Sequence, residues 1–150
     1  MSQAESKPAV PTGFWIVAVL STVWNAFGAY DYVMTRLRDL AYLDGASGGK
    51  GAAMLQWLDG LPLLVQICWP LGVWASLAGS VLLLLGSRHA VTVFLVSLVA
   101  AVISMGTERF LGIPAEFAST AMTVMNVVVV VVIVALWRYA VSAKARGLLR

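Results

Sequence analysis

Charged residues are scarce in this 150-residue chain: they make up 11% of it, whereas hydrophobic residues make up 61%. A soluble globular domain is about 45–50% apolar and about 25% charged. A single domain of this size buries too little surface to hide so much apolar material. The composition therefore excludes a soluble enzyme, a nucleic-acid-binding domain, a disordered chain and a disulfide scaffold, and it places most of the chain in lipid.

Cysteine and histidine are almost absent, with one residue of each. Cys68 has no second cysteine with which to form an internal disulfide or a cysteine-based metal site, so we interpret it as a packing residue. His89 lies in a polar turn, and a single histidine there assembles neither a Ser-His-Asp triad nor a metal or heme site. We therefore expect no enzyme, no catalytic residue, no metal and no cofactor.

Four long apolar stretches are present, and each holds roughly the 17–25 residues needed to cross the hydrocarbon layer. The pattern predicts an all-α protein, a polytopic transmembrane four-helix bundle within residues 13–139. We expect spans over about residues 13–35, 62–86, 90–107 and 114–138. Outside them we expect a polar N-terminal tail (1–12), an outer loop with a short interfacial helix (36–61) and a basic C-terminal tail (140–150).

The positive charges set the expected orientation. Four spans place both termini on one side, where six cations gather: Lys7, Arg88, Arg138, Lys144, Arg146 and Arg150. The other side has four: Arg36, Arg38, Lys50 and Arg109. The positive-inside rule then predicts that both termini of this multi-pass chain lie in the cytoplasm. The basic C-terminal tail is expected to meet anionic lipid of the bilayer.

Polar residues inside the spans are the main functional signal, because unpaired polar groups are costly in hydrocarbon. In the first span they fall on one stripe: Ser21, Asn25, Gly28, Asp31, Tyr32 and Thr35. An ionisable residue such as Asp31 suggests a functional site, although an ion pair with Arg36 or simple hydration is the competing interpretation. The candidate substrate-binding residues form an outer-facing polar crevice: Asn25, Asp31, Tyr32, Gln66 and Glu108.

Other polar and small residues are expected to hold the bundle together. The candidates for interhelical polar contacts are Asn25, Asn126, Ser97 and Ser104, with Asn25 and Asn126 meeting at mid-depth. Small residues allow helix backbones to approach closely. The candidates for helix packing are Gly28, Gly72, Ser76, Gly79 and Ser80.

The first three expected spans also resemble a known family. Trp24-Asn25-Ala26-Phe27-Gly28-Ala29-Tyr30-Asp31-Tyr32-Val33-Met34-Thr35 fits the pattern W-N-x-x-G-x-x-D-[YF]-x-M-T, and the likeness extends over about residues 14–105. This stretch is similar to a family of small uncharacterised four-span alphaproteobacterial inner-membrane proteins, some of which are named "sugar transporter". The resemblance implies that the chain is a multi-pass protein of the bacterial inner (cytoplasmic) membrane. The resemblance points to Asn25, Gly28, Asp31 and Thr35, whereas the glycine-rich loop at 45–51 departs from the family.

These observations lead to two expectations of function. The first is small-solute (sugar-like) transport or sensing through the outer-facing polar crevice. Because four spans are few for a transporter built from internal repeats, a solute path would need a homo-oligomer. The alternative is a structural or accessory subunit that packs against another membrane-protein partner through its small-residue helix face. No nucleic-acid partner is expected.

Overall fold

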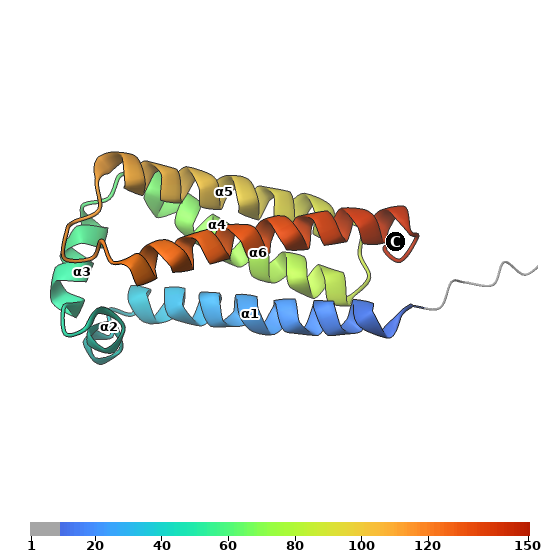
Figure 1. Ribbon diagram of the computed structural model, residues 1–150, viewed down its shortest axis with the longest axis horizontal. Coiled ribbons are helices and arrows are strands. Elements are labelled where there is room, and N and C mark those ends of the chain that lie inside the picture. The colour runs from blue at the N-terminus through green and yellow to red at the C-terminus, as the bar shows by residue number, and fades with distance from the viewer. Residues whose placement is uncertain (1–9) are drawn as a thin grey trace, which may run out of the picture.

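The structure is a computed structural model that describes residues 10–150, and it folds this part of the chain into six helices without a strand (Figure 1). The helices are α1 (Thr12–Arg36), α2 (Leu40–Ser47), α3 (Gly51–Asp59), α4 (Leu63–Leu84), α5 (Ala90–Leu111) and α6 (Thr120–Ala145). Four of them, α1, α4, α5 and α6, are long and apolar enough to cross a membrane. The predicted all-α four-helix transmembrane bundle is confirmed, and the chain is a multi-pass membrane protein.

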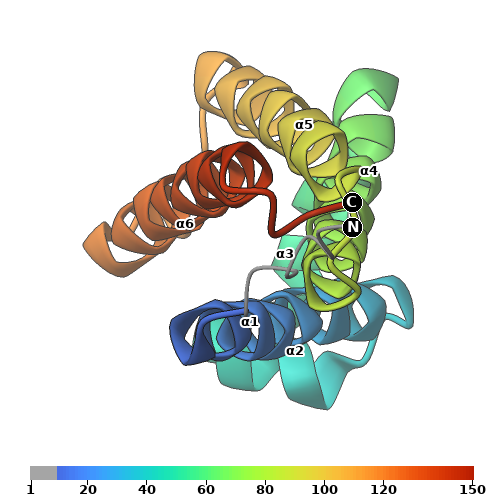
Figure 2. The same ribbon diagram turned by 90° about the vertical axis from the view of Figure 1, so that its right-hand side faces the viewer.

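The four long helices follow one another around the bundle in chain order, as the view along the bundle shows (Figure 2). α4 packs against both α1 and α5, whereas α6 packs mainly against α5. The buried share of the most apolar stretch is 11% in α6, compared with 39% in α4. α4 is therefore the central helix and α6 the peripheral one, and α4 continues as a helix through Pro70.

Small residues on α4 set how closely its neighbours approach. A methyl group at Gly79 would lie 2.9 Å from the ring of Phe94 on α5, and one at Gly72 would lie 3.4 Å from the backbone nitrogen of Ala101. The hydroxyl of Ser97 donates a 2.8 Å hydrogen bond to the carbonyl of Gly72 across the same contact. α5 therefore packs against this face of α4 at Gly72 and Gly79. The expectation that the small-residue face docks a separate membrane protein stays a prediction.

A buried apolar core lies at the end of the bundle where the described chain begins and ends. It brings together Phe14, Leu83, Phe94 and Leu136 from the four long helices, and Leu149 from the C-terminal turn. Leu149 is held there because the backbone of Arg150 exchanges two 2.8 Å hydrogen bonds with the α4–α5 turn at residues 86 and 88.

The tail expected at 140–150 is thus wrong for most of its length. α6 continues to Ala145, and the last residues fold back onto the bundle to bury Leu149. At the other terminus α1 begins at Thr12, and residues 1–9 of the predicted polar tail lie outside the described residues.

The opposite end of the bundle is covered by the segment between α1 and α4. The expected interfacial helix is present as α3, but a second helix, α2, precedes it because the carboxylate of Asp39 accepts a 2.9 Å hydrogen bond from the backbone nitrogen of Tyr42 and caps it. Trp57 of α3 packs against Phe117, with ring centroids 5.9 Å apart. The ammonium group of Lys50 donates to the carbonyl of Glu116 at 3.1 Å. Both contacts join this segment to the α5–α6 connection.

The α5–α6 connection is longer than the sequence suggested. α5 continues to Leu111 rather than ending near 107, and α6 begins at Thr120 rather than at Pro114. Pro114 instead begins a turn, in which its carbonyl accepts a 2.9 Å hydrogen bond from the backbone nitrogen of Phe117. The turn places the buried Phe117 ring under Trp57, a long-range contact that a helix-start signal does not reveal.

Candidate functional site

Asn25 lies at the α1–α4 interface and is satisfied there by two serines. Its amide nitrogen donates to the hydroxyl of Ser80 at 2.6 Å, and the hydroxyl of Ser76 donates to its amide oxygen at 2.6 Å. All three side chains are buried. A buried amide with both ends hydrogen-bonded stabilises helix packing, so Asn25 serves as an interhelical contact.

Two of the predicted interhelical contacts differ in the structure. Asn126 makes no side-chain hydrogen bond within residues 10–150, and Asn25 does not pair with it because α1 packs on α4 and α6 on α5. The hydroxyl of Ser104 donates to Glu108 four residues later on the same helix, at 3.0 Å, rather than to a neighbouring helix. Gly28, expected at a packing contact, is exposed, and a methyl group there would meet no atom within 4 Å.

Asp31 is exposed near the C-terminal end of α1 and interacts with α2. The hydroxyl of Tyr42 donates a 2.7 Å hydrogen bond to its carboxylate. This hydrogen bond is the main cause that raises the pKa of Tyr42 to about 12. No ion pair joins Asp31 to Arg36 in the described part of the chain, since five residues on a helix correspond to a turn of about 140° and direct the two side chains apart.

Two of the predicted crevice residues do come together, and Arg36 joins them. The guanidinium group of Arg36 donates to the hydroxyl of Tyr32 at 3.2 Å and to the amide oxygen of Gln66 at 2.8 Å. Its central carbon also lies 5.4 Å from the ring centroid of Tyr32 and 5.5 Å from that of Trp69. We call the set of Tyr32, Arg36, Gln66, Trp69 and Trp74 the outer-rim cluster.

The outer-rim cluster is braced from α3 and α4. The amide nitrogen of Gln66 donates to the carbonyl of Leu58 at 2.8 Å, which fixes the amide oxygen toward Arg36. Trp69 and Trp74 meet the ring of Tyr32 edge-on, with centroids 5.1 and 6.3 Å apart. These contacts hold an arginine and three aromatic rings together between α1 and α4.

Arg36 has no carboxylate partner among residues 10–150. The one ion pair there joins Arg38 and Asp59, 2.8 Å apart and exposed on both sides. That hydrogen-bonded pair lowers the pKa of Asp59, and the more distant charge on Arg36 adds to the effect. Arg36 is therefore a cation held by neutral groups, which is an arrangement that favours an anion.

The other three crevice candidates form their hydrogen bonds with residues outside this cluster. Asn25 is bonded to α4, Asp31 to α2 and Glu108 to its own helix. Sequence reasoning missed Arg36 and Trp69 as site residues. The available signal was the four-residue spacing of Tyr32 and Arg36, which places both side chains on one side of a helix.

Comparisons with known proteins identify no relative of this chain. No family model, curated protein or solved structure matches the chain. The resemblance to a small four-span family therefore stays a prediction.

Proposed function

We propose that the protein binds a small anionic, sugar-like solute at the outer-rim cluster, as the recognition step of transport or sensing. The observation that carries the proposal is Arg36, which is hydrogen-bonded to Tyr32 and Gln66 but has no ion pair in the described residues. A guanidinium group forms its strongest hydrogen bonds with carboxylate or phosphate oxygens. A bound anion would supply the charge that this site lacks.

The aromatic rings favour a solute with a ring of its own. Trp69 is half-buried beside the guanidinium group of Arg36, and Trp74, which contacts Tyr32, is 47% exposed. Both rings therefore present apolar surface at the cluster. Binding sites that fix a polar ligand typically combine such surfaces with a few polar groups. A sugar acid, with an apolar ring face and one carboxylate, fits both requirements.

The proposal includes an orientation. The cluster lies at the end of the bundle opposite the described termini, and the terminal end has the larger number of cations (Figure 1). If the basic end lies on the cytoplasmic side of a bacterial inner membrane, the cluster faces the outer side. It would then meet solutes before they enter the cell.

The test is a tryptophan-fluorescence titration of the full chain in lipid nanodiscs. D-glucuronate should give a saturable change, and neutral D-glucose a weaker one. Arg36→Gln should weaken glucuronate binding about tenfold or more, because one charge-assisted interaction is lost. Arg109→Gln removes a cation from the same side and should leave binding unchanged. Equal binding by Arg36→Gln and the wild type, or no saturable glucuronate response in the wild type, would contradict the proposal.

An accessory role is the second candidate, and the position of α6 favours it. Its buried residues are Ile133, Leu136, Ala140 and Ala143, all in its second half. In the first half Met125 and Val127 are more than half exposed. A helix of a partner membrane protein could cover this surface. Stoichiometric co-purification of one membrane protein in mild detergent, abolished by Val127→Trp and not by Leu85→Trp, would support this role over solute binding.

A further inference from the structure

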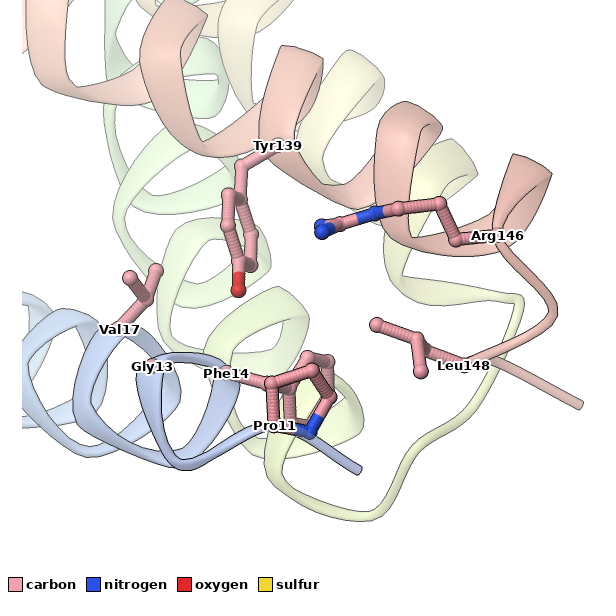
Figure 3. A pocket seen from close by; sticks show the side chains of 7 residues that line it. All are labelled: Pro11, Gly13, Phe14, Val17, Tyr139, Arg146 and Leu148. Carbon is pink, nitrogen blue, oxygen red and sulfur yellow. The ribbon is translucent and has the colours of Figure 1, made fainter. Parts of the chain in front are cut away.

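A pocket of about 340 Å³ lies between the first turn of α1 and the last turns of α6, at the basic end of the bundle (Figure 3). Phe14, Val17 and Leu148 give it apolar walls, and Tyr139 and Arg146 give it polar groups. Figure 3 shows the side chain of Arg146 extending toward the ring of Tyr139. The central carbon of its guanidinium group lies 5.8 Å from the ring centroid.

The charged side chains at this end of the bundle are all positive within residues 10–150. Five cations lie on the last turns of α6, on the C-terminal turn or on the adjoining α4–α5 turn: Arg88, Arg138, Lys144, Arg146 and Arg150. The acidic residues of the described chain lie at the opposite end, on the last turns of α1 and α5 or in the segments beyond them. Arg146 has no ion pair within the described residues, and the one hydrogen bond of its side chain is a long 3.4 Å contact with the carbonyl of Ser142.

The apolar side of the pocket continues along the bundle. Beyond Val17, the same side of α1 continues to Trp24 and Gly28. Trp24 is 39% exposed, and the position of Gly28 has open space around it. Facing helix α6 leaves Val128 37% exposed. A chain of methylene groups leaving the pocket would therefore find apolar surface on both helices at the depth of the membrane.

We infer that this pocket binds one anionic phospholipid. The phosphate would accept hydrogen bonds from the guanidinium group of Arg146 and the hydroxyl of Tyr139, and an acyl chain would lie along Phe14 and Val17. The ligand must be both anionic and apolar, and it must reside at the membrane surface. An anionic phospholipid of the basic-side leaflet has all three properties. This site is independent of the outer-rim cluster.

The test is native mass spectrometry of the detergent-solubilised full chain titrated with phosphatidylglycerol or phosphatidylcholine of identical acyl chains. The wild type should retain one phosphatidylglycerol in preference to phosphatidylcholine. Arg146→Gln should weaken phosphatidylglycerol binding about tenfold, the loss of one charge-assisted contact. Val17→Trp, which fills the apolar wall and keeps every charge, should also weaken it. Lys144→Gln removes a neighbouring exposed cation that does not line the pocket and should leave binding unchanged.

Three results would overturn the inference. Equal losses in Lys144→Gln and Arg146→Gln would show diffuse attraction to the basic end instead of a built site. Unchanged binding in both Arg146→Gln and Val17→Trp would show that lipid does not enter the pocket. Displacement of phosphatidylglycerol by millimolar inorganic phosphate alone would show a site for a soluble anion. Thermal unfolding of each variant distinguishes a misfolded protein from one that has lost the site.

Discussion

Asn25 of α1 and Ser80 of α4 are joined by a 2.6 Å hydrogen bond between buried side chains, 55 residues apart in the chain. Ser76, one turn earlier on α4, donates to the other end of the same amide. This three-residue contact sets the register of the first span against the central helix.

Asn25→Ala should lower the free energy of unfolding by about 1–2 kcal/mol, because it removes two interhelical hydrogen bonds and leaves two buried hydroxyl groups without that partner. Asn126→Ala is the matched control, since Asn126 makes no side-chain hydrogen bond within residues 10–150 and should lose little. Unfolding in mixed detergent micelles measures both variants. Equal stability of the two would show that the Asn25 contact does not hold the bundle.

Gly79→Ala should destabilise the protein by roughly 1–3 kcal/mol, the range for overpacking a well-filled core. The new methyl group would lie 2.9 Å from the Phe94 ring, which is fully buried. Gly28→Ala makes the same change where nothing lies within 4 Å, and it should leave stability unchanged or slightly higher. The same unfolding assay compares them. A loss at Gly28 equal to that at Gly79 would contradict the α4–α5 packing described above.

Asp31→Asn should lower the pKa of Tyr42 from about 12 toward its ordinary value of 10. The hydrogen bond from Tyr42 to the Asp31 carboxylate is the main cause of the raised pKa, and the substitution removes that carboxylate. The folded-state pKa lies above the unfolded value. The stabilisation is therefore complete below pH 10 and is lost as the pH rises through about 12.

The titration of tyrosinate absorbance, taken as the difference between each protein and its Tyr42→Phe variant, isolates this group. Asp44→Asn is the control. The carboxylate of Asp44, on α2, accepts from the backbone nitrogen of Gly51, and its removal should leave the Tyr42 titration unchanged. A Tyr42 pKa near 10 in the wild type would show that the Asp31 contact is absent in solution.

Leu149→Ala should cost about 2–4 kcal/mol of stability, because Leu149 is 6% exposed within the core. It should also speed trypsin cleavage after Arg146, since the folded-back C-terminus would be released more often. Leu85→Ala is the control, at a position 74% exposed on the adjoining turn. If the two variants were equally stable and equally resistant, the C-terminus would not be docked.

Local pattern predicted that there are four spans, because each depends on its own run of apolar residues, but it misplaced the ends of the last two. The small residues of α4 were identified by their spacing, yet the sequence could not tell whether α5 or a separate protein fills that face. Asn25 illustrates the same limit. Its depth was predictable, but its choice of Ser76 and Ser80 over Asn126 depends on which helices are neighbours.

The candidate site was harder to predict, because it depends on side-chain direction and on long-range contacts. Tyr32 and Gln66 were predicted as polar residues of the crevice. The group that joins them is Arg36. The sequence offered Arg36 only as an ion-pair partner of Asp31, and that pairing would direct its side chain elsewhere. α2 and the turn that buries Phe117 likewise depend on contacts between segments far apart in the chain.

Gln66→Glu tests the outer-rim site most directly, because it keeps the oxygen that accepts from Arg36 at 2.8 Å and replaces the amide nitrogen that donates to Leu58 with a second, charged oxygen. The new carboxylate would pair with the guanidinium group and occupy the place of a solute anion. Gln56→Glu adds the same charge at an exposed position of α3, on the same side of the membrane. Calorimetric titration of nanodisc-embedded protein with D-glucuronate should show binding by the wild type and Gln56→Glu and a loss of about tenfold or more in Gln66→Glu. Undiminished binding by Gln66→Glu would contradict the account.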